Sequence, residues 1–209
     1  DLQSARTLLI IVACIQAYQI LAGTYTAIKW KQLTRMLIFA GIGMPIGLLA
    51  VNYLPENPLV IALGIVSIAG GLSGMRLQKS SVPVQWPGPI LDSMLVIGGI
   101  VHGAFATGGA TIAVYTQQKI PEKDLFRGTA NMFWVITNTI LAGSLFLQKD
   151  YSAPGWQTLL AATVVTIAAG WLANRSARNM AQERFTRLVS VLLVLGGVVT
   201  IARTVMQAS

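Results

Sequence analysis

A glycine-rich stretch at residues 90–118 is the feature that most constrains this sequence. The stretch is apolar enough to enter a bilayer, yet Gly108 and Gly109 follow directly after Thr107. Because glycine costs roughly 1 kcal/mol relative to alanine inside a helix, we expect the helix to break there. About 14 helical residues would precede the break and about 9 would follow it, whereas a span needs about 20. Neither half is long enough to cross a membrane alone.

A break at membrane depth would make this stretch a candidate binding site. In hydrocarbon each unpaired backbone N–H or C=O costs several kcal/mol, so such breaks persist only inside protein or beside a water-filled cavity. The second half-helix would begin near Gly109, and its N–H groups and positive dipole end favour an anion. The first half-helix would end there with its negative pole, so the dipoles alone do not fix the sign of the ligand. The alternative interpretation is that the glycines only allow close helix packing.

The composition is that of an integral membrane protein. Of the 209 residues, 54% are hydrophobic and 11% are charged, against about 25% charged in soluble domains. This length allows six or seven apolar segments in a single membrane domain, residues 1–209, whose partner is the lipid bilayer. The formal net charge is +8, but no basic run is long enough to grip a phosphate backbone, so we expect no nucleic-acid partner.

The acidic residues argue against several kinds of site. All seven lie at segment ends or in loops, and Asp92 is expected to cap the first half-helix. Buried carboxylates would be needed for a proton relay or for binding a metal. We therefore expect no metal site and no cofactor. A single histidine without a buried acid, and the absence of HExxH and GxSxG motifs, also argue against an enzyme.

Two short patterns recur at the same spacing. Trp-Lys-Gln-Leu at 30–33 resembles Trp-Gln-Thr-Leu at 156–159, and Gly-Gly at 70–71 recurs at 196–197, each 126 residues later. Transporters are often built from such repeats. We predict a first, incomplete repeat at 1–80, a linker at 81–89, and a second repeat with the broken segment at 90–209.

The basic residues indicate how the broken segment meets the membrane. If it crossed, the basic connections at 76–89 and 174–187 would fall on opposite sides, which violates the positive-inside rule. If it enters and leaves by one face, all four basic connections share the cytoplasmic side, and the nearly uncharged turns at 55–58 and 148–154 share the other. We therefore predict an all-α polytopic membrane protein in which two inverted three-helix repeats flank a re-entrant Gly-rich hairpin. Both chain ends would lie outside.

The order of the motifs resembles the TauE/SafE family of sulfite and organosulfonate exporters. The resemblance is carried by Trp-Lys-Gln-Leu at 30–33, Gly43-Met44-Pro45-Ile46-Gly47, the run Gly98-Gly99-Ile100-Val101-His102-Gly103-Ala104-Phe105-Ala106-Thr107-Gly108-Gly109, Tyr115, and Arg127-Gly128-Thr129. It implies a multi-pass protein of the bacterial inner membrane that moves small sulfur-containing anions such as sulfite, sulfoacetate or other organosulfonates. A homodimer is one assembly that we consider. The sequence departs from the family because no first Gly-rich segment precedes Asp1, so we expect either a cut chain or a half-sized site.

Candidate substrate-binding residues gather around the predicted break. His102, the only histidine, could hydrogen-bond an anion or change protonation, or it could simply satisfy backbone groups freed by the break. Backbone N–H groups would hold the substrate, and threonine hydroxyls would add donors. The set comprises His102, Gly103, Thr107, Gly108, Gly109, Ala110 and Thr111.

Uncharged amides and one arginine complete the candidate set. Asn131 and Asn138 are seven residues apart and share a helix face. In the first repeat Gln16 occupies a position near that of Asn138, and Gln19 lies one turn further on. They could face a hydrated oxyanion, or they could only link helices. Arg127 could attract anions at the cytoplasmic mouth or report topology. The leading function is a transporter working by alternating access, and the alternative is a passive anion channel with re-entrant half-helices.

Overall fold

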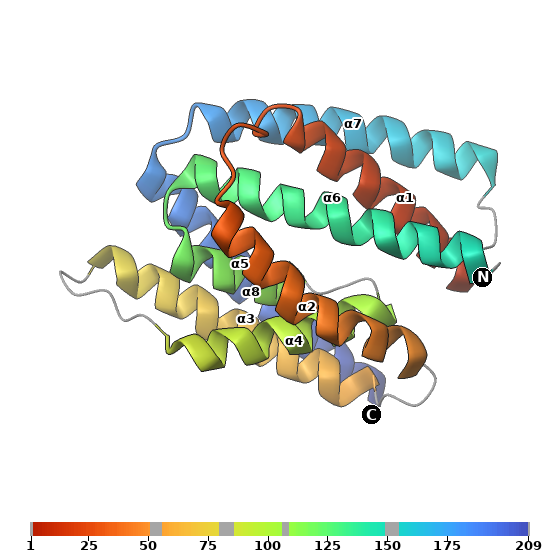
Figure 1. Cartoon of the computed structure of the whole chain (residues 1–209), viewed down its shortest axis with the longest axis horizontal. Helices are drawn as coiled ribbons and strands as arrows, with labels where there is room; N and C mark the ends of the chain where they lie inside the picture. The colour runs from red at the N-terminus through yellow and green to blue at the C-terminus, as the bar shows by residue number, and fades with distance from the viewer. Residues whose placement is uncertain (1, 51–55, 80–85, 106–108, 149–154, 209) are drawn as a thin grey trace. The chain divides into compact units, whose positions relative to one another are not determined.

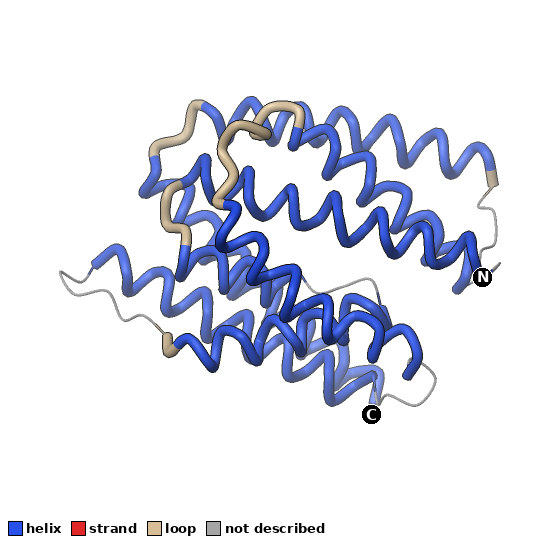
Figure 2. Tube along the Cα trace, in the orientation of Figure 1, coloured by secondary structure: helices blue, strands red, loops and turns tan. Residues whose placement is uncertain are grey.

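Helices make up nearly all of the chain that the computed structural model describes, residues 2–50, 56–79, 86–105, 109–148 and 155–208 (Figure 2). In this part of the chain there are eight helices and no strand. They are α1 Leu2–Leu21, α2 Trp30–Ala50, α3 Glu56–Lys79, α4 Gly88–Phe105, α5 Gly109–Lys119, α6 Lys123–Gln148, α7 Trp156–Arg178 and α8 Gln182–Ala208. Helices satisfy every backbone group within one segment, which a bilayer requires. The predicted all-helical fold class is confirmed.

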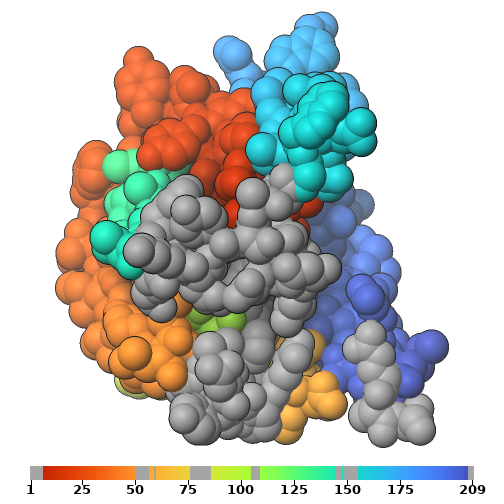
Figure 3. Space-filling view, turned by 90° about the vertical axis from the view of Figure 1, so that its right-hand side faces the viewer, coloured from red at the N-terminus to blue at the C-terminus, as the bar shows by residue number. Residues whose placement is uncertain are grey.

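Three helices are clearly long and apolar enough to cross a membrane. These spans are Trp30–Leu49 in α2, Trp156–Arg178 in α7 and Gln182–Met206 in α8. Side chains near the start of α7 lie at the surface in Figure 3, and Trp156 and Leu160 are 73% and 60% exposed. Exposed apolar side chains along such helices suit contact with lipid.

The chain forms two compact units, each assembled from segments that are distant in the sequence. Unit 1 comprises residues 1–33 and 124–180, and therefore α1, α7 and nearly all of α6. Unit 2 comprises residues 34–123 and 181–209, and therefore α3, α4, α5, α8 and most of α2. Because each unit takes helices from both halves of the chain, the repeat boundaries stay a prediction.

Polar side chains link the helices of unit 1. The Gln19 amide of α1 donates to the Ile167 carbonyl of α7 over 2.9 Å, and Gly170 leaves room for that side chain. The hydroxyls of Tyr18 and Thr139 share a hydrogen bond of 3.1 Å between α1 and α6. Such links matter in lipid, where helices gain little from apolar contact alone.

Glycines bring α3 and α8 of unit 2 into backbone contact. A Cβ on Gly64 would lie 3.0 Å from the Gly197 carbonyl oxygen, and one on Gly71 would lie 2.5 Å from the Ser190 carbonyl oxygen. Both distances are at or below the closest approach of real Cβ atoms, so larger residues would push the helices apart. Glycine at these two positions therefore lets α3 pack directly on α8.

A second glycine contact, which we call the glycine seam, joins α2 to α4. It consists of Gly43 and Gly47 on α2 and Gly99 and Gly103 on α4, each pair four residues apart. A Cβ at any of the four would overlap a backbone carbonyl oxygen of the other helix. Neither helix can therefore move closer or accept a side chain here.

Asp92 was wrongly expected to be a helix cap. Helix α4 begins at Gly88 with Pro89 in its first turn, where proline's missing N–H costs nothing, so Asp92 falls one turn later. Its two carboxylate oxygens instead accept from Nε and Nη2 of Arg35 on α2, over 2.8 and 2.6 Å. The side chain that we assigned to a local role thus joins two helices beside the glycine seam.

The seam predicts opposite effects for two neighbouring glycines of α2. Gly43→Ala should destabilise the protein by about 1–3 kcal/mol, because the new Cβ would overlap the Val96 carbonyl oxygen. Gly41→Ala is the matched control, since nothing lies within 4 Å of its Cβ position. It should leave stability within about 0.5 kcal/mol or raise it through helix propensity. Unfolding midpoints in mixed detergent micelles measure both, and equal midpoints would contradict the seam.

Candidate functional site: the α4–α5 helix pair

Two separate helices occupy the stretch where we expected a broken one. Helix α4 ends at Phe105 after 18 residues, and α5 begins at Gly109 and has 11. At 1.5 Å per residue, α5 is about 16 Å long, roughly half the hydrocarbon thickness. Thr107 and Gly108, the centre of the predicted break, lie outside the described residues.

The chain turns back between α4 and α5 (Figure 1). A Cβ on Gly98 would overlap the hydroxyl oxygen of Thr111. In one straight helix these two residues, 13 positions apart in the sequence, would be separated by about 20 Å. At the other end, the backbone N–H of Trp86 donates to the Gln118 amide oxygen over 3.3 Å. The two helices therefore lie antiparallel, with residues 86 and 118 close together.

The described candidates of this pair differ in accessibility. His102, in the last turn of α4, is 5% exposed, and Thr111, in the first turn of α5, is fully buried. Ala110 is half-buried and Gly109 is exposed. Gly103 belongs to the glycine seam, where a Cβ would overlap the Met44 carbonyl oxygen, so the packing interpretation accounts for this residue.

Two glutamines that sequence reasoning missed anchor the other end of α5. The Gln117 amide donates to the Ser190 hydroxyl of α8 over 2.7 Å, and the Gln118 amide donates to the Ser73 hydroxyl of α3 over 3.0 Å. Trp86 Nε1 donates to the same Ser73 hydroxyl over 3.1 Å. Both glutamines are about 95% buried. The sequence did contain an indication of these bonds, because two adjacent amides lie at the end of an apolar segment. Burying such amides costs free energy unless they are hydrogen-bonded.

The remaining candidates lie in unit 1. Asn131 donates to the Arg127 carbonyl of its own helix over 2.6 Å, and Asn138 is 4% exposed. Gln16 is exposed, and Gln19 bonds to α7 as described above. For Gln19 the structure thus shows a link between helices, the alternative that the sequence left open, whereas Asn131 bonds within its own helix.

Arg127 lies inside α6, not in a loop, and is only 7% exposed. Its guanidinium donates to the Asn174 side-chain oxygen of α7 and lies 3.8 Å from the Asp124 carboxylate. Charge-assisted bonds of this kind satisfy a buried guanidinium. Arg127 therefore connects α6 to α7 in unit 1.

The predicted site residues are thus divided between the two units. His102, Gly103, Gly109, Ala110 and Thr111 are in unit 2, whereas Gln16, Gln19, Arg127, Asn131 and Asn138 are in unit 1. Their convergence on one ligand stays a prediction. Among the described residues, no group of three or more His, Cys, Asp or Glu side chains could hold a metal ion.

Apolar helices long enough to span a bilayer define this chain as an all-helical, multi-pass membrane protein. The chain belongs to the sulfite exporter TauE/SafE family, whose sequence model matches residues 2–200. Membership implies a membrane exporter of sulfite or related anions, and the family is not a class of enzymes. Searches of curated proteins and of solved structures each found no match.

The contact between Gly98 and Thr111 predicts a coupled pair of substitutions. Gly98→Ala should destabilise the protein by about 1–3 kcal/mol, because its Cβ would overlap the Thr111 hydroxyl. Thr111→Ala removes that hydroxyl, so it should recover part of the loss when combined with Gly98→Ala. Unfolding midpoints of the four proteins should give a coupling energy of at least about 0.5 kcal/mol. Strictly additive effects would show that the helices do not meet at these residues.

Proposed function

We propose that this protein transports small sulfur-containing anions, namely sulfite, sulfoacetate or other organosulfonates, by alternating access around the α4–α5 pair. Family membership supports the coarser statement, an exporter of sulfite or related anions. Alternating access around the α4–α5 pair is supported by the 11-residue helix α5, which begins at Gly109 and packs against α3, α4 and α8. Such a helix ends inside the membrane and is held there by protein.

The first turn of α5 supplies the chemistry for an anion. The backbone N–H groups of Gly109 and Ala110 lie at the N-terminal end of α5, where the first N–H groups of any helix lack an acceptor within the helix. The helix dipole adds partial positive charge at the same end. These groups would replace water around a sulfur oxyanion and would form a site together with His102 from the end of α4.

The proposed membrane arrangement is a re-entrant α4–α5 hairpin between inverted repeats. Helices α2 and α7 begin 126 residues apart, at Trp30 and Trp156, and α3 and α8 begin 126 residues apart, at Glu56 and Gln182. The same shift of 126 residues takes Gly64 to Ser190 and Gly71 to Gly197. The contact between Gly64 and Gly197 therefore corresponds to the contact between Ser190 and Gly71. This reciprocity supports an internal two-fold relation between α3 and α8. Inverted repeats of this kind are common in secondary transporters.

Flux into proteoliposomes tests the transport function. Reconstituted protein should give saturable sulfite or sulfoacetate flux, and His102→Ala should lower it about 10- to 100-fold, the effect of losing a hydrogen bond to a charged ligand. His102→Gln, which keeps an N–H donor, should recover part of the rate. Ser93→Ala is the control, since this exposed hydroxyl of α4 bonds to the Pro89 carbonyl of its own helix. Saturation must accompany the flux, because non-saturating ohmic currents would indicate a channel instead.

Cysteine labelling tests the re-entrant arrangement. In a Cys14→Ser background, single cysteines at Pro87 and Glu122 should react with an impermeant maleimide from the same side, together with Asn179→Cys. Cysteines at Asn57 and Gly155 should react from the opposite side, because the basic connections are retained in the cytoplasm. Right-side-out cells and inverted vesicles provide the two readouts. Labelling of positions 87 and 122 from opposite sides would mean that residues 90–118 cross the membrane.

A further inference from the structure

The C-terminal end of α7 carries a polar hollow that the proposed transport site does not use. It has a volume of about 330 Å³ and is lined by Trp171, Asn174, Arg175, Arg178 and Asn179. None of these five side chains is acidic, and two are arginines. We call this hollow the arginine pocket.

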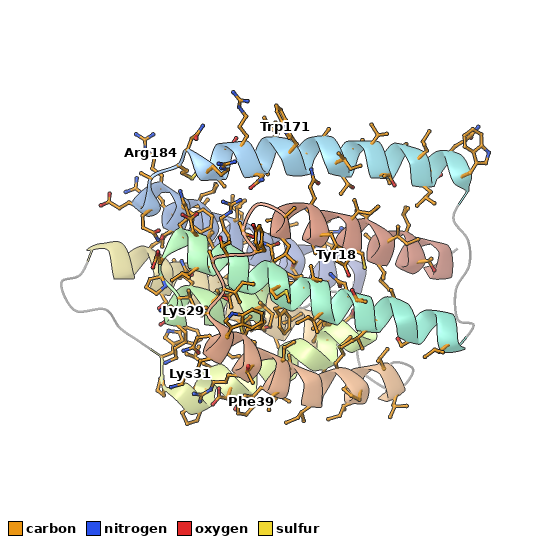
Figure 4. All side chains as sticks on the ribbon, turned by 45° about the horizontal axis from the view of Figure 1, so that its top comes forward. Tyr18, Lys29, Lys31, Phe39, Trp171 and Arg184 are labelled. Carbon is orange, nitrogen blue, oxygen red and sulfur yellow. The ribbon has the colours of Figure 1, made fainter. Side chains whose placement is uncertain are left out.

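The position of the pocket along α7 is that of a membrane interface. The preceding turns expose an apolar face, with Leu160, Val164 and Ile167 each about half exposed or more. Trp171 is 59% exposed and projects outward from α7 (Figure 4). Exposed tryptophans at the end of an apolar span lie at headgroup level, so Arg175 and Arg178, one and two turns further, would reach the phosphate layer.

Neighbouring contacts hold the donors of the pocket in place. The Arg175 guanidinium lies 5.6 Å from the centre of the Trp171 ring, a cation–π distance that keeps it beside the pocket. Arg127 donates to the Asn174 side-chain oxygen, so the amide nitrogen of Asn174 remains the donor of that group.

We propose that the arginine pocket binds the phosphate of an anionic phospholipid, such as phosphatidylglycerol. The guanidinium groups of Arg175 and Arg178 match a phosphate with paired N–H donors, and Asn174 and Asn179 add amide donors. The exposed apolar face of α7 would contact the acyl chains of the same lipid. That continuous apolar contact favours a lipid over a free anion, which would use the polar hollow alone.

Native mass spectrometry of the detergent-solubilised protein tests this site. Titration with phosphatidylglycerol should give saturable binding, and phosphatidylcholine should bind at least tenfold more weakly. Arg175→Gln combined with Arg178→Gln should weaken phosphatidylglycerol binding about 25-fold, since each basic side chain near an anionic headgroup contributes roughly a factor of five. Circular dichroism and thermal unfolding report whether the variant folds.

The matched control is Arg184→Gln combined with Arg187→Gln, which removes the same charge from exposed residues of α8 outside the pocket. Binding should stay within about twofold of the unaltered protein. The proposal would be overturned by equal loss in both double variants or by no loss in the pocket variant. Displacement of the lipid by inorganic phosphate at about 0.15 M ionic strength would also overturn it. If the pocket variant does not fold, Arg175→Lys with Arg178→Lys keeps the charge but loses the paired donors. It should weaken binding about threefold or more, and unchanged binding would overturn the proposal.

Discussion

Direct contact between helix backbones is the interaction on which unit 2 depends. In hydrocarbon there is little gain from burying apolar side chains, so helices associate through close packing and a few hydrogen bonds. The four glycines of the seam allow α2 and α4 to approach until backbone meets backbone, and Gly64 and Gly71 do the same for α3 and α8. A short helix such as α5 can be held at depth only if neighbours this close exclude lipid from its ends.

Polar contacts then fix where α5 lies. Gln117 and Gln118 bond to serines on α8 and α3, so α5 is attached near its C-terminal end. Fixed amide groups at a helix N-terminus are an efficient anion site, because no reorganisation accompanies binding. The anion site that we propose lies at the other end of α5.

Sequence reasoning failed at residues whose partners are far away along the chain. Asp92 was read as a local cap because capping depends only on neighbouring residues, whereas its pairing with Arg35 spans two helices. The glutamines at 117 and 118 were overlooked because their serine partners lie 73 and 45 residues away. For Arg127 the sequence offered a role at the cytoplasmic mouth or in topology, and it gave no sign of the bond to Asn174 of α7, 47 residues away.

The sequence by itself determined the helical membrane class, the family and the stretch in which one helix gives way to two. These follow from local properties, namely apolar length, glycine content and the order of motifs, which do not depend on distant contacts. Only the tertiary structure decided which residues of α4 and α5 meet in the expected hairpin, that glycine is required at the seam, and which polar side chains bond to which helix. Those features depend on the spacing between helices, which no single segment encodes.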